Sequence, residues 1–140
     1  MSAENESKIA LRVLMMPKDT NHEGTIFGGV ILSHIDQAAY IEARRHGTHR
    51  WVTAAINKVD FIAPVFTGDI VSYRTRTVNE GRTSVTVAVE VEAERRKDGT
   101  TVAVTPSEQV VEQFVCVGLP RGTRAAIWKS SRHRIESRVC

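Results

Sequence analysis

The chain has 140 residues, of which 41% are apolar and 25% charged, and a formal net charge of +3. This length fits one domain that can bury a core without disulfides or metal. No apolar run approaches the roughly 18 residues of a membrane span, which excludes a helical membrane protein. Residues 121–140 hold six Lys or Arg and one Glu, so residues 1–120 are mildly acidic. That charge distribution argues against a nucleic-acid-binding fold.

The N-terminus, MSAENESK, is polar and acidic, unlike a secretory signal. The two cysteines, Cys116 and Cys140, have no CxxC partner and are interpreted as reduced thiols. These features predict a cytoplasmic protein. His22 and His34 show no ligand spacing such as HxxxH, so no metal is expected.

The predicted elements begin with a disordered segment, residues 1–7, and a first strand over 8–16. Pro17 ends that strand, and a polar loop follows. A helix is predicted from about Gly28 to Arg45, closed by Gly47. Turn residues then separate further strands, which are expected over 51–61, 70–78, 82–95 and 102–117, the last interrupted at Pro106.

The clearest strand is the segment 82–95, in which apolar and polar residues alternate. This period of two predicts an antiparallel strand with one face on a core. One helix against one curled antiparallel sheet is an α+β layout. The helix is too apolar for a surface helix, so the sheet is expected to wrap around it. Its apolar arc consists of Ile31, Leu32, Ile35, Ala38, Ala39 and Ala43.

An acid, Asp36, falls on the seam between that apolar arc and a polar stripe of the helix. Its carboxylate is therefore expected to be partly desolvated, which raises a carboxyl pKa and makes a better base near neutrality. The alternative is a solvated residue, or one paired with Tyr40 or an arginine.

Two glycines, Gly28 and Gly29, stand where the helix begins. They leave the free N–H groups and the positive end of the helix dipole open to a substrate carbonyl, an arrangement that can stabilise an oxyanion. The alternatives are a tight turn or close packing. Asn21, just before, could place a water or a carbonyl, or could serve only the turn.

Several stretches together carry a family resemblance: PKDTNHEGTIFGG followed by SHIDQAA, VTAAINKVDFIAPVFTGDIV, GRTSVTVAVEVEAE and EQFVCVGL. The combination resembles the hotdog-fold acyl-CoA thioesterases, and is most similar to the YciA-type and cytosolic acyl-CoA hydrolase group. The similarity spans about residues 8–119, which we expect to form the hotdog domain, followed by a basic tail over 120–140.

The resemblance implies a long central helix wrapped by a curved antiparallel sheet of five to six strands. It implies hydrolysis of acyl-CoA to a free acid and CoA, without a cofactor, by homodimers commonly assembled into hexamers. The active site would lie at the dimer interface. Asp36 would act there as general base or nucleophile. Asn21 would come from the facing subunit, and amides around Gly28 and Gly29 would polarise the carbonyl.

The CoA part of the substrate carries phosphates, so cations are expected near the site. Thr83 and Ser84 would lie along the CoA path by resemblance, and Arg82 and Lys58 could pair with phosphate. The basic tail could clamp the 3′-phosphate or act only as a solubilising end. Val30 departs from the family pattern, in which a larger residue is expected.

Two other functions stay open. One is a non-catalytic acyl-CoA-binding hotdog regulator whose basic tail contacts DNA, although no helix-turn-helix segment is visible. The other is a hotdog enoyl-CoA hydratase or dehydratase. That chemistry usually needs a His/Asp or His/Glu dyad, for which His34 is the one histidine within the helix motif.

Overall fold

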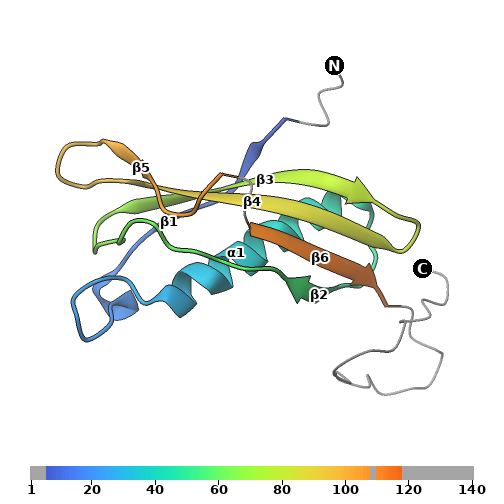
Figure 1. Cartoon of the computed structure of the whole chain (residues 1–140), viewed down its shortest axis with the longest axis horizontal. Coiled ribbons are helices and arrows are strands. Elements are labelled where there is room, and N and C mark those ends of the chain that lie inside the picture. Colours follow the sequence, from blue (N-terminus) through green and yellow to red (C-terminus); the bar gives the residue numbers. More distant parts are fainter. Residues whose placement is uncertain (1–5, 108–109, 118–140) are drawn as a thin grey trace.

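The computed structural model of the chain describes residues 6–107 and 110–117. In this part of the chain one α-helix packs against a six-stranded antiparallel sheet (Figure 1). Two short 3-10 segments, η2 (Pro17–Asp19) and η3 (Arg44–His46), flank the helix. The other elements are β1 (Lys8–Leu14), α1 (Gly28–Ala43), β2 (Trp51–Ile56), β3 (Ile70–Glu80), β4 (Ser84–Glu94), β5 (Thr101–Ala103) and β6 (Val110–Cys116).

The sheet has the strand order β1-β3-β4-β6-β2, and all neighbours are antiparallel. β5 pairs with the far end of β4, beyond the part that pairs with β6. Figure 1 shows α1 running alongside the long strands β3 and β4. The helix also contacts β1, β2 and β6. The predicted α+β layout, with the sheet curled around the helix, is therefore confirmed.

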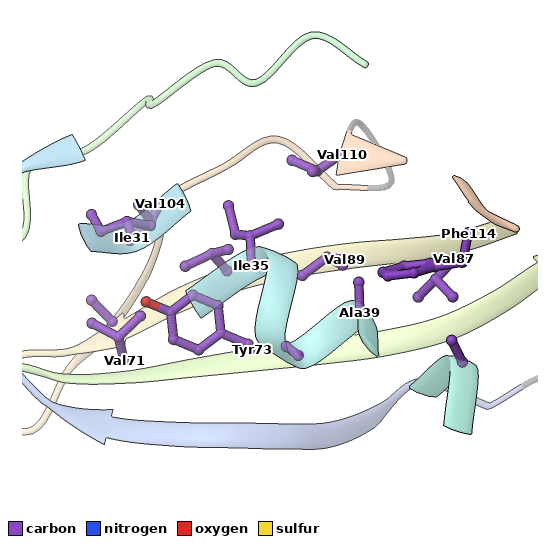
Figure 2. Close-up of a cluster of buried hydrophobic side chains, with 14 of the residues drawn as sticks. Ile31, Ile35, Ala39, Val71, Tyr73, Val87, Val89, Val104, Val110 and Phe114 are labelled. Atoms are coloured by element: carbon purple, nitrogen blue, oxygen red, sulfur yellow. The ribbon is translucent and has the colours of Figure 1, made fainter. Parts of the chain in front are cut away.

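The core lies between the helix and the concave face of the sheet (Figure 2). The alternation predicted for residues 82–95 is confirmed, because every second side chain of β4 is buried. Each buried aliphatic side chain of this kind stabilises the fold by roughly 1.5–3 kcal/mol. The buried residues of β4 on this face are Val85, Val87, Val89, Val91 and Ala93.

The helix begins at Gly28 as predicted, and the chain is turned by Gly47, whose φ is +134°. The α-helix itself ends at Ala43 and continues as η3, so the predicted end at Arg45 was two residues too late. Leu32 was expected in the buried arc but is 38% exposed. The sheet covers a narrower stripe of the helix than the apolar pattern implied.

The second strand ends at Ile56, five residues before the predicted end. Asn57 donates its backbone N–H to the Val111 carbonyl (3.0 Å), and its Oδ1 accepts from the Val111 N–H (2.8 Å). The side chain thus takes the place of a backbone partner, near the point where β6 begins. The interruption at Pro106 is confirmed, since the predicted strand 102–117 is divided into β5 and β6.

Cys116 is buried at the end of β6 and is disulfide-bonded. The interpretation of this residue as a reduced thiol was wrong, because residue spacing alone does not report redox state. Cys140, the predicted tail 120–140 and residues 1–5 of the expected disordered segment lie outside the described residues. In the described part, no helix is long and apolar enough to span a membrane.

Candidate active site

Asp36 lies midway along α1, half-buried, on the wall of a hollow of about 450 Å³. The helix forms one side of this hollow, and the ends of β2 and β6 form the other. The tilted rings of Tyr40 and Phe114, with centroids 6.5 Å apart, make much of the lining apolar. The lining residues are Asp36, Gln37, Tyr40, Ile41, Trp51, Thr53 and Phe114. An acid in such a place is partly shielded from water yet accessible to a small molecule.

The carboxylate of Asp36 is held from the sheet. Thr53 Oγ1 on β2 donates a hydrogen bond to Asp36 Oδ1 at 2.6 Å. Neither Tyr40 nor an arginine bonds to Asp36 in the described part of the chain, and the Tyr40 hydroxyl instead accepts from Arg44 at 3.3 Å. The open alternatives of a solvated or Tyr40-paired aspartate are thus not what the structure shows.

A second acid, Glu112 on β6, completes this cluster. Its side chain is fully buried, and its Oε1 lies 3.2 Å from Thr53 Oγ1. The pKa of Glu112 is raised to about 9. Burial is the largest cause, followed by the hydrogen bond to Asp36 and the charge of Asp36, whereas the hydrogen bond from Thr53 lowers it. At neutral pH, Glu112 is therefore a neutral carboxylic acid beside Asp36.

Sequence reasoning missed both Glu112 and Thr53. A signal for Glu112 was present, because residues 110, 112, 114 and 116 alternate toward the core and the acid stands among apolar neighbours. An acid at an inward position of a strand needs a partner. Its partner on the helix could not be read from this pattern, since it comes from a distant part of the chain.

The start of α1 borders a separate hollow of about 330 Å³. Phe27 provides no side-chain cap, so the first N–H groups of the helix have no side-chain partner there. Neither Gly28 nor Gly29 has a positive φ, so a special turn conformation does not explain them. A Cβ at Gly28 would lie 3.4 Å from the Phe61 ring, an ordinary van der Waals contact, so close packing does not require a glycine at this position. Val30 packs against the core and lines neither hollow.

The helix start and Asp36 are far apart in one chain. Eight residues at 1.5 Å each separate Gly28 from Asp36 by about 12 Å along the axis. A single chain therefore does not place both groups around one thioester carbon.

Asn21 serves its own loop in this structure. Its Oδ1 accepts from the backbone N–H groups of Glu23 (2.9 Å) and Thr25 (3.2 Å), and its Nδ2 donates to Thr25 Oγ1 (2.9 Å). It lines neither the hollow at Asp36 nor the hollow at the helix start. The turn chemistry left open as an alternative is thus present in the single chain.

The residues predicted to bind CoA lie outside the hollow at Asp36. Arg82 and Thr83 lie in the turn between β3 and β4, and Ser84 begins β4, where its carbonyl accepts from the Gly81 N–H (2.8 Å). Lys58 follows β2, is exposed and forms an ion pair with Asp60 at 3.2 Å. None of the four lines either hollow.

His34 faces Tyr73 rather than Asp36. Its Nδ1 lies 3.4 Å from the Tyr73 hydroxyl, and the two rings meet edge to face. Burial lowers the pKa of His34, more than the nearby charge of Asp19 raises it. Within the described residues, no group of three or more His, Cys, Asp or Glu is placed to hold a metal ion.

A curved antiparallel sheet around one central helix is the arrangement by which this chain can be compared with solved structures. The chain is similar to the crystal structure of a hexameric hotdog fold thioesterase of Campylobacter jejuni, with 43% identity and a TM-score of 0.72. The match covers 79% of this chain and 83% of that one. The fold is therefore the hotdog fold, as the resemblance implied.

The family follows from the sequence. The profile of the thioesterase superfamily matches residues 23–100, more than half of the chain, so the chain belongs to that superfamily. It is 46% identical over 81 residues to an uncharacterized acyl-CoA thioester hydrolase of Zymomonas mobilis, covering 58% of this chain. It is 40% identical over 86 residues to the acyl-CoA thioester hydrolase YciA of Escherichia coli, covering 61%. These matches span 54% and 65% of the relatives' own lengths, less than two thirds.

Proposed function

We propose that this protein is an acyl-CoA thioesterase that hydrolyses acyl-CoA to a free carboxylic acid and CoA. The observation that carries the proposal is the Asp36 carboxylate, fixed by Thr53 at 2.6 Å on the wall of an open hollow. It stands in a chain of the thioesterase superfamily. Relatives at about 40% identity are named acyl-CoA thioester hydrolases, which agrees with this substrate class.

Hydrolysis of a thioester needs few catalytic groups from the protein. A thioester has weak resonance stabilisation and a good leaving group, so one activated water and donors to the carbonyl oxygen suffice. Asp36 takes a proton from water as the water oxygen attacks the carbonyl carbon. The C–S bond then breaks, and the CoA thiolate leaves and takes up the proton. Attack by Asp36 itself is the alternative. No step needs a cofactor or metal.

The oxyanion donors would come from a second protomer. The separation of about 12 Å between Gly28 and Asp36 in one chain supports a site at a dimer interface. There, amides at Gly28 and Gly29 and the side chain of Asn21 would belong to the facing subunit. Relatives crystallised as hexamers support a homohexamer of three dimers for this chain.

The CoA moiety would extend along the turn at Thr83 and Ser84, with Arg82 and Lys58 near its phosphates. These residues would lower KM rather than raise kcat, because they touch a part of the substrate that does not react. The catalytic domain proposed here covers residues 8–119, and the role of residues 120–140 stays a prediction.

A cytoplasmic location is proposed because acyl-CoA esters are substrates found inside cells. The disulfide at Cys116 is unusual for that compartment. Fractionation of cells that produce the protein checks the location.

The function is tested with Asp36→Asn and Asp36→Ala in a free-thiol release assay on acyl-CoAs of different chain length. Loss of the base is expected to lower kcat about a hundredfold or more, with an unchanged circular dichroism spectrum. Ser33→Ala, on the exposed side of the same helix, is the matched control and keeps wild-type activity. Near-wild-type turnover by either Asp36 variant would refute the assignment.

The same free-thiol release assay separates hydrolysis from the two alternative functions. A regulator would bind acyl-CoA without releasing thiol, and a hydratase would consume enoyl-CoA without releasing thiol. The dehydratase alternative is weakened by His34, since its ring faces Tyr73 and forms no dyad with Asp36.

A further inference from the structure

We propose that Glu112, in its protonated form, is a positioning residue for acyl-CoA hydrolysis, holding the Asp36 carboxylate by a donated hydrogen bond and through the shared hydroxyl of Thr53. This inference rests on the proposed function and concerns a residue on β6 to which the resemblance assigns no role.

The first support is the sharing of one hydroxyl. Thr53 Oγ1 lies 2.6 Å from Asp36 Oδ1 and 3.2 Å from Glu112 Oε1. A hydroxyl has a single proton to donate. The shorter contact assigns that proton to Asp36. An ionised Glu112 would then share no hydrogen with either Thr53 or Asp36. A stabilising contact of Glu112 with these residues therefore needs a proton on Glu112.

The second support is the state of the other oxygen of Glu112. Oε2 is buried and has no hydrogen-bond partner among the described residues. Buried polar atoms are nearly always satisfied. A proton on Glu112 resolves this, because a neutral carboxyl can donate to Asp36, the group whose hydrogen bond and charge favour the neutral form.

Few charged groups other than Asp36 face the Glu112 side chain. Asp36 comes from α1 and Thr53 from β2, and the partners of Glu112 in the sheet register are Ile56 on β2 and Val87 on β4. No cation contributes to the titration of Glu112 in the described part of the chain. Asp36 is thus the charged group with which Glu112 interacts.

The consequence for the reaction is a requirement for one proton in the pair. With that proton present, the pair carries one negative charge, and the donated bonds aim the Asp36 carboxylate along the wall of the hollow. When Glu112 ionises, two carboxylates face each other without a shared proton and Asp36 loses its support. Since burial and Asp36 raise the pKa of Glu112 to about 9, activity is expected to fall on the alkaline side.

The test compares Glu112→Gln with Glu112→Leu by free-thiol release across about pH 6–10. Glutamine keeps an N–H donor but cannot ionise, so kcat at neutral pH should stay within about threefold of wild type while the alkaline fall disappears. Leucine removes the donor, so kcat should drop about tenfold or more while KM changes little. Thermal melting establishes that each variant is folded.

Two outcomes overturn the inference while the proposed function stands. One is a Glu112→Leu variant with wild-type kcat and an unchanged pH profile. The other is a folded Glu112→Gln variant as inactive as Asp36→Asn. If wild-type protein releases no thiol from any acyl-CoA, the proposed function fails first and the inference falls with it.

A second measurement does not depend on turnover and reports the proton on Glu112 directly in the wild-type protein. The infrared carbonyl band of a protonated carboxyl should be present in wild-type protein at neutral pH and absent from Glu112→Gln. It should also persist in Asp36→Asn, which removes the charged partner. Absence of the band from wild-type protein would overturn the inference.

Discussion

The two acids beside Thr53 differ in their access to water. Asp36 lies half-buried on a hollow, whereas Glu112 is fully buried between the helix and the sheet. Burial penalises the charged form of an acid, and a neighbouring negative charge penalises it further. Both effects act on Glu112 and favour its neutral form beside Asp36.

This difference predicts a dependence of stability on pH. The pKa of Glu112 is about 9 in the folded chain and near its ordinary value of 4.5 in the unfolded chain. Below the lower value both states hold the proton and the contribution to stability is complete. Between the two values only the folded state holds it. The free energy of unfolding should therefore fall as pH rises, by at most about 1.4 kcal/mol per pH unit.

Urea denaturation of wild type and Glu112→Gln at about pH 5, 7 and 8.5 measures this fall. Glutamine does not titrate, so the difference in unfolding free energy between the two proteins should shift in favour of the variant as pH rises. A difference that stays constant over this range would contradict the raised pKa.

At the scale of elements, Asp69 ties the start of β3 to the end of β4. Its carboxylate is 3% exposed and accepts from Arg95 Nη1 (2.7 Å), the Phe66 N–H (2.9 Å) and the Arg96 N–H (3.3 Å). The Arg95 guanidinium also lies 5.1 Å from the centre of the Phe66 ring. One buried carboxylate thus accepts hydrogen bonds from two backbone N–H groups and from the Arg95 guanidinium.

Asp69→Ala should lower the free energy of unfolding by about 3–5 kcal/mol, because it leaves Arg95 without its partner in a mostly buried place. The control is Glu94→Ala. Glu94 pairs with Arg12 at 2.6 Å, but the two side chains are 40% and 51% exposed. An exposed pair contributes about 1 kcal/mol or less. Equal losses in the two variants, measured by urea denaturation, would contradict this account.

At the scale of the whole molecule, we propose that the reaction uses groups from two chains. The distance of about 12 Å between the helix start and Asp36 in one chain cannot be closed by side-chain rotation. Asn21 is likewise used within its own loop, away from the hollow at Asp36. Its amide could still face a second protomer.

Co-expression of Asp36→Asn and Asn21→Ala chains, each inactive alone, tests a shared site. If Asp36 and Asn21 come from opposite chains, a mixed dimer contains one intact site and one doubly altered site. Random pairing should then restore about a quarter of wild-type activity in the purified mixed oligomers. Co-expressed Asp36→Asn and Asp36→Ala chains are the control and should recover nothing. No recovery in the first mixture would place both residues in one site of one chain.

Local patterns were enough for much of the fold. The period of two in β4, the helix from Gly28 and the turn at Gly47 all follow from residues close together in sequence, because side-chain spacing and backbone φ act over a few residues. Asp36 could be singled out in the same way, as an acid at the edge of an apolar arc.

The tertiary structure decided what depends on distant partners. β2 ends at Ile56 because the Asn57 side chain bonds to Val111, and Leu32 lies exposed although it belongs to the apolar arc of the helix. Glu112 becomes a neutral acid because burial and Asp36 act on it together, across elements far apart in sequence. The sequence by itself determined which residues could form a helix and a sheet, and which carboxylate is the candidate base. Only the packed chain decided which acid stays charged, since that depends on water and charge in three dimensions.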